Sequence, residues 1–275
     1  MTKFWHWSDA PSGDFAVVGD PISHSLSPKI HTAAYRSCGL ELTYRAIHVR
    51  SGGLAEAIDV LRGRGYQGLN VTVPLKTEAL DWCCRVESDV ERMGAVNTLN
   101  LASGEGTNTD APGFLKTLGD LGISRGRVLL LGAGGTARAL LVALTNAGFD
   151  VSVWNRTKGN ADAIVELTRS KAHVLEVPDP SGSDLILNTT AASLKGQSLP
   201  ILWERASKET LAYDCFYSAS KTQFQQDAEE HGIQSVDGRA MLVAQAALAF
   251  EWWLGLPAPQ TDMMKASYEH PDANA

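Results

Sequence analysis

A glycine-rich turn at residues 132–137 has the residue types and spacing of a loop that binds the pyrophosphate of a dinucleotide. It reads Gly132-Ala133-Gly134-Gly135-Thr136-Ala137 and fits the pattern G-x-G-x-x-A. It follows an apolar run and precedes a helical stretch, so the first glycine allows a tight turn and the second lets backbone N–H groups approach a pyrophosphate. The helix start adds unpaired donors and partial positive charge. We therefore predict a dinucleotide-binding loop, with a purely structural glycine turn as the alternative.

The end of the next expected strand, residues 150–154, indicates which dinucleotide the loop binds. NAD-binding chains usually carry Asp or Glu there, which accepts a hydrogen bond from the ribose 2′-hydroxyl. Here the strand is followed by Asn155-Arg156-Thr157, without a carboxylate. Arg156 can instead pair with a 2′-phosphate, and Thr157 can donate a further hydrogen bond. The sequence favours NADP over NAD, and a solvated surface charge is the alternative for Arg156.

Polar stretches in the first part of the chain also follow expected strands, which is where open α/β sheets bind ligands. Ser25 and Ser27 precede a helix start, so their hydroxyls could bind an anion beside helix N–H groups, although Ser27 could be a plain helix cap. Lys76 follows a stiffening proline but, taken alone, is more often a solvated charge. The stretches 94–98 (GAVNT) and 106–110 (GTNTD) carry amide, hydroxyl and carboxylate groups that suit hydroxyl recognition and are also typical of turns.

Short β-branched strands that alternate with longer helices must position these residues, a pattern typical of a mainly parallel sheet. We expect strands at 15–19, 44–49, 68–73, 127–132, 150–154, 184–188 and 212–216, and helices at 28–38, 54–62, 136–147, 160–170, 240–254 and about 262–268. After a turn-rich stretch at 102–113 the pattern starts again, which predicts two α/β domains with a boundary near Asp110. No strand follows the apolar helix 240–254, so we expect it to pack back across the first domain.

Composition excludes several functional classes. The 275 residues are 44% hydrophobic and 20% charged, which is typical of a globular protein rather than a disordered one. The net charge of −7 argues against a nucleic-acid-binding protein. The chain shows neither an apolar run of membrane-spanning length nor a secretory signal, so we expect a cytoplasmic protein without a membrane partner. The four cysteines lack zinc spacing, so we predict buried, reduced thiols and no metal site.

Eight motifs in chain order resemble those of the shikimate dehydrogenase family, from about Phe15 to Pro257. They are GDPISHSLSP, GLNVTVPLK, GAVNT, GTNTDAPG, GAGGTARA, NRT, YDCFY and DGRAMLVAQAALAF. The resemblance implies an NADPH-dependent, reversible reduction of 3-dehydroshikimate to shikimate, a step toward chorismate and the aromatic amino acids. It also implies a catalytic domain of residues 1–110 plus 240–275, a Rossmann-type NADP-binding domain of residues 111–239, and a cleft between them. Whether the protein is a monomer or a homodimer stays open.

The resemblance further implies roles for individual residues. Lys76 and Asp110 would be the catalytic pair, and both would touch the substrate. The other substrate-binding residues would be Ser25 and Ser27 on the carboxylate, Thr72, Asn97 and Gln245 on the ring hydroxyls, and Tyr217 near the carboxylate. The cofactor would contact Gly132 to Ala137, Asn155 to Thr157, the backbone near Cys215, and Gly238.

The chain departs from the common family pattern at Thr32, at 189–193 (TTAAS) and at 217–219 (YSA), and none of these changes removes a proposed catalytic group. The nearest alternative function is an NAD-dependent quinate/shikimate dehydrogenase, which the missing carboxylate after residue 154 disfavours. A non-catalytic nucleotide sensor is a second alternative, but it would need neither Lys76 nor Asp110. A metal-dependent dehydrogenase would need a ligand cluster that the sequence lacks.

Overall fold

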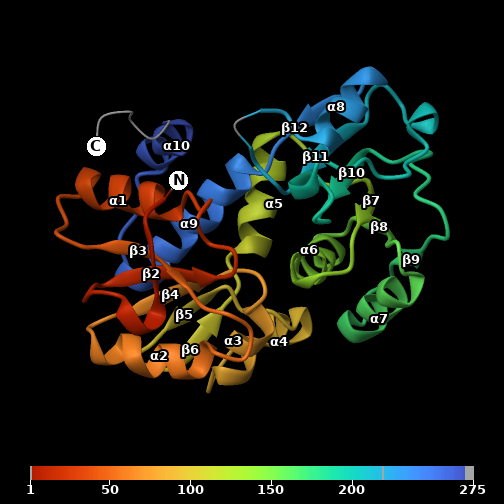
Figure 1. Ribbon diagram of the computed structural model, residues 1–275. Coiled ribbons are helices and arrows are strands. Elements are labelled where there is room, and N and C mark those ends of the chain that lie inside the picture. Colours follow the sequence, from red (N-terminus) through yellow and green to blue (C-terminus); the bar gives the residue numbers. More distant parts are fainter. Residues whose placement is uncertain (1, 219, 270–275) are drawn as a thin grey trace. The chain divides into compact units, whose positions relative to one another are not determined.

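The computed structural model describes residues 2–218 and 220–269, and the chain forms two compact α/β units (Figure 1). Unit 1 contains the chain up to Gly113 and from Leu242 onward, and unit 2 contains Phe114–Met241. The chain leaves unit 1 within α5 (Asp110–Asp120) and returns to it within α9 (Arg239–Leu254). Unit 1 is therefore built from two distant parts of the sequence, whereas unit 2 is one continuous stretch.

Unit 1 is built on a six-stranded sheet in the order β1-β3-β2-β4-β5-β6. The strands are β1 (Phe4–His6), β2 (Phe15–Gly19), β3 (Tyr44–His48), β4 (Gly68–Val71), β5 (Thr98–Asn100) and β6 (Glu105–Thr107). β1 to β4 are parallel, whereas β5 runs antiparallel to both β4 and β6. Besides parts of α5 and α9, the helices of unit 1 are η1 (Trp7–Asp9), α1 (Ser27–Ser37), α2 (Leu54–Gly63), α3 (Lys76–Trp82), α4 (Ser88–Met93) and α10 (Gln260–Tyr268).

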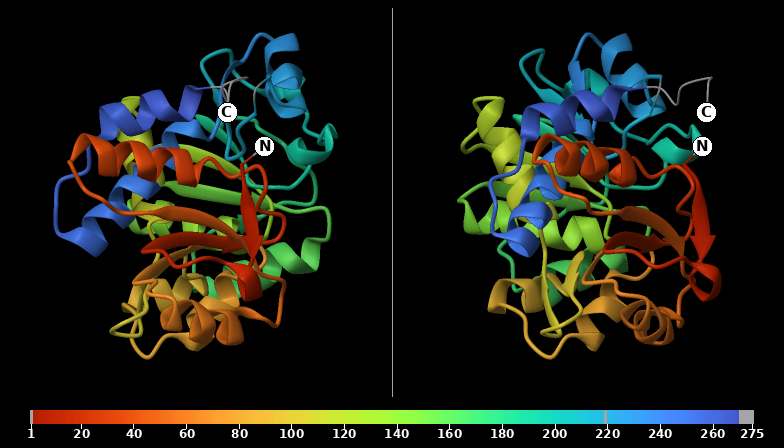
Figure 2. Two further views of the ribbon diagram at one scale, coloured as in Figure 1. Left: turned by 60° about the vertical axis from the view of Figure 1, so that its left-hand side comes forward. Right: turned by 90° about the vertical axis from the view of Figure 1, so that its left-hand side faces the viewer.

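The central strand β2 shows why this sheet is covered on both faces. All five of its residues, FAVVG, are buried, as expected for a parallel strand between two helical layers. Ala16 and Val18 belong to the core on the α2 face, and Phe15 and Val17 belong to the core that α1 and α9 complete. Figure 2 shows the two layers, with α2 and α3 in orange on one face and α1, α9 and α10 in red and blue on the other. The late apolar helix thus packs on the first sheet, as its sequence predicts.

Unit 2 has a parallel sheet in the order β12-β11-β10-β7-β8-β9. Its strands are β7 (Arg127–Leu131), β8 (Asp150–Trp154), β9 (His173–Val174), β10 (Leu185–Asn188), β11 (Leu211–Asp214) and β12 (Gln234–Val236). Its remaining helices are α6 (Gly135–Asn146), α7 (Lys158–Thr168), η2 (Ser193–Lys195), η3 (Trp203–Arg205) and α8 (Gln223–Glu230). This strand order is that of a doubly wound Rossmann-type sheet, so the predicted α/β fold class is confirmed.

The expected turn-rich stretch 102–113 is the largest error in the element prediction. It contains strand β6 and the start of helix α5. Pro112 and Gly113 look like turn residues, but Pro112 lies in the first helical turn, where its missing N–H is not needed. A Cβ atom on Gly113 would lie 2.9 Å from the backbone nitrogen of Gln245, so glycine here allows α5 and α9 to approach closely. The glycine serves packing rather than a turn.

Two expectations from composition have different outcomes. The predicted burial of all four cysteines is wrong, because Cys38 and Cys84 are exposed and Cys83 and Cys215 are half-buried, although all four thiols are free. Among residues 2–218 and 220–269, no helix has the length and apolar character that a membrane crossing requires. The cytoplasmic location stays a prediction.

Candidate active site

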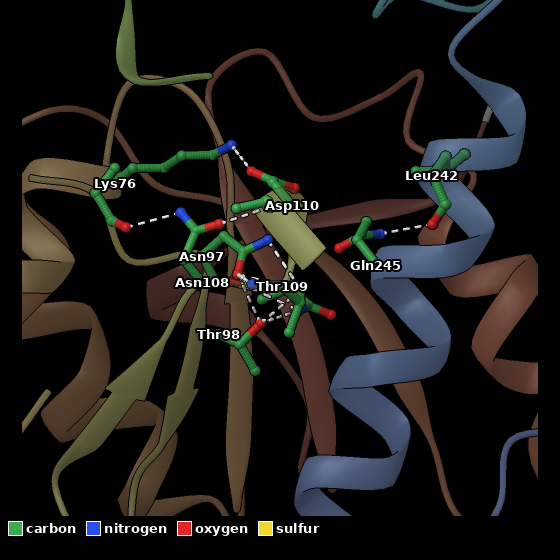
Figure 3. Close-up of polar contacts among 11 residues, drawn as sticks. Lys76, Asn97, Thr98, Asn108, Thr109, Asp110, Leu242 and Gln245 are labelled. Atoms are coloured by element: carbon green, nitrogen blue, oxygen red, sulfur yellow. Dashed lines mark hydrogen bonds and ion pairs between the residues drawn. The ribbon is translucent and has the colours of Figure 1, made fainter. Parts of the chain in front are cut away.

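Lys76 and Asp110 form an ion pair in unit 1. The Lys76 Nζ atom lies 2.5 Å from Asp110 Oδ2, and the side chains are only 14% and 11% exposed (Figure 3). Each residue opens a helix, Lys76 opening α3 and Asp110 opening α5, so helix starts fix both backbones. The Val96 N–H donates to the Lys76 carbonyl oxygen at 3.0 Å, which ties the start of α3 to the segment before β5. The predicted pair is therefore brought together, with an ammonium held by a carboxylate and little water around them.

Asn108 fixes the start of α5 and hence Asp110, a role that our sequence interpretation missed. Its Oδ1 accepts from the Ala111 N–H at 3.1 Å, and its Nδ2 donates to the Ala95 carbonyl oxygen at 2.8 Å. An amide that accepts from a free helix N–H stabilises the helix end. The signal was present as an Asn two residues before the helix.

Asn97 is buried with its amide orientation fixed. Its Oδ1 accepts from the Thr109 backbone N–H at 2.8 Å and from the Thr98 hydroxyl at 2.9 Å. A backbone N–H can only donate, so the carbonyl end of the amide must face Thr109. Among residues 2–218 and 220–269 the Nδ2 atom makes one hydrogen bond, to Thr109 Oγ1 at 3.0 Å, and has a second N–H left. Asn97 can therefore offer a ligand a hydrogen-bond donor (Figure 3).

Gln245 extends from α9 toward the group around Asp110 and Thr109, as Figure 3 shows. Its Nε2 donates to the Leu242 carbonyl oxygen at 2.8 Å. The amide nitrogen is thus held by its own helix, and the amide oxygen is the end directed at the group. The predicted residue Gln245 therefore lies on the same side of unit 1 as the ion pair.

The serine loop before α1 differs in one respect from its prediction. Leu26 occupies the N-cap position of α1 and Ser27 is the first helical residue, so Ser27 is not the helix cap. Ser25 Oγ accepts from the Ser27 N–H at 3.3 Å, and no described residue accepts the Ser25 hydroxyl hydrogen. Both serines are buried beyond the carboxyl end of β2, and Thr72 follows the last residue of β4. Thr72 thus lies one residue beyond the strand, which is shorter than predicted.

His31 is a fully buried histidine of α1 whose ring stacks on Tyr44, with centroids 4.1 Å apart and planes 2° from parallel. Burial lowers the pKa of His31 from 6.5 to about 3, while a contact with the Asn70 amide acts in the opposite direction. Between these two pKa values the unfolded chain binds a proton that the folded chain does not, so stability falls as the pH falls from 6.5 toward 3.

Replacing His31 with phenylalanine should weaken this acid sensitivity. Within this interval, each unit by which the pH falls lowers the wild-type free energy of unfolding by about 1.4 kcal/mol through His31. The reason is that protonation favours the unfolded chain. The His31→Phe variant keeps an aromatic ring beside Tyr44 and lacks the titrating group. Urea unfolding from pH 7 to pH 4.5 should therefore show a shallower loss of stability. Replacing the exposed His173 with Gln should leave the wild-type slope, and a wild-type slope in His31→Phe would contradict the prediction.

The glycine loop of unit 2 has the geometry that its sequence predicts. Gly132 adopts φ 114°, a conformation that favours glycine, and a Cβ atom there would lie 2.5 Å from Thr189 Oγ1. Gly134 is the N-cap of α6 and would meet no atom within 4 Å, which leaves space above the helix start. Ala137 is fully buried, so α6 packs closely on the sheet. The loop, the open helix start and the small residue together fit a bound pyrophosphate.

The segment after β8 places a cation beside a second helix start. Arg156 is exposed and, within the described part of the chain, makes no hydrogen bond or ion pair. Asn155 Nδ2 donates to the Thr157 carbonyl oxygen at 2.8 Å, and Thr157 is the N-cap of α7 with no capping bond from its side chain. A guanidinium, a hydroxyl and helix N–H groups are all hydrogen-bond donors. They suit a phosphate better than a pair of ribose hydroxyls.

The remaining predicted residues of unit 2 gather after β11. Gly238 N–H donates to the Phe216 carbonyl oxygen at 2.9 Å, which brings Gly238 beside the segment that contains Cys215. The Arg239 guanidinium lies over the Tyr217 ring, 6.0 Å from its centroid. Tyr217, predicted to bind substrate, thus belongs to unit 2, whereas the other predicted substrate residues belong to unit 1.

Asp214 is a buried carboxylate that our sequence interpretation did not single out. It accepts from the hydroxyls of Ser193 (2.5 Å) and Thr222 (2.7 Å), the Asn188 amide (3.1 Å) and the Phe216 N–H (3.1 Å). Burial raises its pKa, and these hydrogen bonds act in the opposite direction. Asp214 ties the ends of β10 and β11 together, including the 189–193 loop that departs from the family pattern. Its place in the YDCFY motif was the available signal.

Comparison with known proteins identifies the family. Residues 17–99 match the family described as "Shikimate dehydrogenase substrate binding domain", and residues 238–266 match "Shikimate 5'-dehydrogenase C-terminal domain". The chain is 37% identical over 264 residues to the shikimate dehydrogenase (NADP(+)) of Nitrosopumilus maritimus, with 92% of this chain and 97% of that protein covered. It is 40% identical over 260 residues to the enzyme of the same name from Thermus thermophilus, with the same coverage.

A solved structure supports the same assignment. The shikimate 5-dehydrogenase of Thermus thermophilus, in complex with NADP(H) and shikimate, is similar to this chain with a TM-score of 0.85 and 38% identity. The similarity covers 92% of this chain and 98% of that one. High coverage of both chains means that the likeness extends over both units rather than over a shared nucleotide fold alone. This chain belongs to the shikimate dehydrogenase family.

Proposed function

We propose that the protein catalyses the reversible reaction 3-dehydroshikimate + NADPH + H⁺ ⇌ shikimate + NADP⁺, a step toward chorismate and the aromatic amino acids. The observation that carries the proposal is the Lys76–Asp110 pair, nearly buried and 2.5 Å apart, beside amide and hydroxyl groups that suit a polyhydroxylated ring. Relatives at 37–40% identity that are named NADP(+) shikimate dehydrogenases support it. In this proposal unit 1 binds the substrate and unit 2 binds NADP.

Unit 2 has groups that fit each part of NADP. The turn 132–137 would hold the pyrophosphate against the α6 start, and Arg156 with Thr157 would hold the 2′-phosphate. Asn155, the Cys215 backbone and Gly238 would complete the cofactor contacts. When bound, NADPH supplies the hydride for the reduction.

Lys76 would handle the proton. Reduction of the C3 carbonyl places negative charge on its oxygen, and the Lys76 ammonium can stabilise that charge and donate a proton to it. In the oxidation direction the resulting amine accepts the hydroxyl proton. Asp110 holds the ammonium at 2.5 Å, so it fixes the direction from which the proton is delivered. Lys76 would thus be the acid in the reduction and the base in the oxidation, so no second acid is required.

The remaining polar residues of unit 1 would bind the substrate at several points. The Ser25 and Ser27 hydroxyls would bind its carboxylate, with Tyr217 from unit 2 as a further contact. Asn97 would donate its free N–H to a ring hydroxyl, while Gln245 would accept through its amide oxygen and Thr72 would add a hydroxyl. Binding at both ends would orient the C3 carbonyl toward Lys76.

Initial rates with four substrate pairs test the proposal. Shikimate or quinate is supplied with NADP⁺ or NAD⁺, and reduced nicotinamide is followed by absorbance. We expect shikimate with NADP⁺ to give the highest kcat/KM, because Arg156 replaces the carboxylate that NAD enzymes use. Higher kcat/KM with quinate and NAD⁺ would support the alternative dehydrogenase. Binding of NADP⁺ without turnover in any pair would support the nucleotide sensor, and either result would overturn the proposal.

A further inference from the structure

Tyr44 is a buried residue of β3 whose hydroxyl begins a series of buried side-chain hydrogen bonds in unit 1. Its Oη donates to Asn70 Oδ1 at 2.6 Å, and both residues are buried. Burial raises the pKa of Tyr44 well above its usual value. The phenol therefore stays protonated, and its hydrogen goes to Asn70.

The hydrogen bond to Asn70 continues toward Asn97. Asn70 Nδ2 donates to Thr98 Oγ1 at 3.0 Å, and the Thr98 hydroxyl donates to Asn97 Oδ1 at 2.9 Å. Each side chain from Tyr44 to Thr98 thus donates to the next one, from β3 through β4 to the start of β5. Figure 3 shows the last part of this chain, where Thr98 lies beneath Asn97. We call Tyr44, Asn70, Thr98 and Asn97 the buried polar chain.

The direction of donation determines what Asn97 offers a ligand. With Oδ1 accepting from Thr98 and from the Thr109 N–H, the free group of Asn97 is an N–H donor. If Tyr44 lost its hydroxyl, Asn70 Oδ1 would be buried without that donor, and an unsatisfied buried carbonyl favours rearrangement of the amide. A rearranged Asn70 amide would change the donor that Thr98 receives, and thus the orientation of Asn97.

We propose that Tyr44 is a positioning residue for substrate binding, acting along the buried polar chain on Asn97 at its other end. This inference rests on the proposed function. Packing alone does not require the hydroxyl, because the Tyr44 ring stacks on His31 and phenylalanine would keep that ring. The hydroxyl donates to a side chain that is linked through Thr98 to Asn97, rather than to a backbone group, and this link points to positioning.

Tyr66 provides a matched control. It is also a buried tyrosine of unit 1, but its hydroxyl donates to the backbone carbonyl of Pro11 at 2.9 Å, away from the buried polar chain. Tyr44→Phe and Tyr66→Phe each remove one buried hydroxyl and keep the ring. Both variants should therefore show a similar small decrease in melting temperature. Only Tyr44→Phe should alter substrate binding.

The experiment compares kcat, KM for shikimate and KM for NADP⁺ in both variants and in the wild type. Tyr44→Phe should raise KM for shikimate by about tenfold, the effect of one lost hydrogen-bonded arrangement, with a smaller change in kcat and none in KM for NADP⁺. Tyr66→Phe should match the wild type in all three constants. An unchanged KM for shikimate in Tyr44→Phe, or an equal rise in Tyr66→Phe, would overturn the inference.

A second variant keeps the inference testable if Tyr44→Phe folds poorly. Thr98→Val removes the next hydroxyl of the chain and should also raise KM for shikimate, and the double variant should be no worse than the more affected single one. Additive effects on KM would mean that the Tyr44 and Thr98 hydroxyls act separately. That result would contradict the proposed link from Tyr44 to Asn97. If the wild type itself did not oxidise shikimate, the proposed function would fail and this inference with it. A fully active wild type with unaffected variants would overturn only the inference.

Discussion

Replacing Lys76 with alanine should lower kcat by about 10²–10⁴-fold, the usual contribution of general acid–base catalysis. The variant would lose the ammonium that stabilises charge on the C3 oxygen and delivers the proton, while the other substrate contacts stay in place. KM for shikimate should therefore change much less than kcat. Steady-state rates in both directions measure the two constants, and NADP⁺ binding followed by fluorescence confirms that the nucleotide site is intact.

The Lys116–Asp120 pair of α5 is a control for the removal of a lysine from an ion pair. Its Nζ–Oδ2 distance is 2.8 Å, but the side chains are 42% and 67% exposed. An exposed pair of this kind contributes little, so Lys116→Ala should retain wild-type rates. Wild-type turnover in Lys76→Ala would remove Lys76 from the mechanism.

Replacing Arg156 with glutamine should raise KM for NADP⁺ by about 10- to 100-fold and leave KM for NAD⁺ nearly unchanged. Hydrogen bonds to charged groups contribute about 1.5–3 kcal/mol, and only NADP⁺ carries the 2′-phosphate that the guanidinium would bind. Within the described residues Arg156 has no partner to lose, so its removal should not unfold unit 2. Titration of the nucleotide at saturating shikimate gives both constants.

Arg125 serves as the matched control for Arg156. It is an exposed arginine just before β7, at the amino end of the strand and therefore at the opposite edge of the sheet from the glycine loop. Arg125→Gln should change neither constant. Equal losses for NADP⁺ and NAD⁺ in Arg156→Gln would mean that the arginine does not recognise the phosphate.

The parts of the fold that the sequence predicts well are those in which local pattern and burial agree. The strand 150–154 has the predicted bounds, because its apolar residues Val151, Val153 and Trp154 are buried and Asn155-Arg156 ends the pattern. α3, α4 and β6 were missed because they are short and largely polar, so their stability comes from packing partners distant in the chain. α5 was missed because Pro112 and Gly113 resemble a turn, whereas the need for glycine arises from contact with Gln245, far along the chain.

The residues of the candidate site also divide into those that the sequence predicts and those that it does not. Motifs supplied the residues that would touch substrate and cofactor, because their types and order are distinctive along the chain. The residues that hold them, such as Thr98, Asn108 and Asp214, act through hydrogen bonds between segments that meet only in the folded chain. A sequence pattern cannot show which amide end faces which donor. The orientation of Asn97 and the role of Tyr44 therefore emerge only from the three-dimensional structure.

The split origin of unit 1 has a consequence for biosynthesis. One face of its sheet is completed by apolar residues of α9, including Val243, Ala247 and Phe250. A ribosome makes these residues only after all of unit 2, so until then α1 covers this face of the nascent sheet without α9. Unit 2 can fold as soon as its continuous stretch emerges. Whether the residues up to Gly113 reach their native state therefore depends on residues that are synthesised after unit 2.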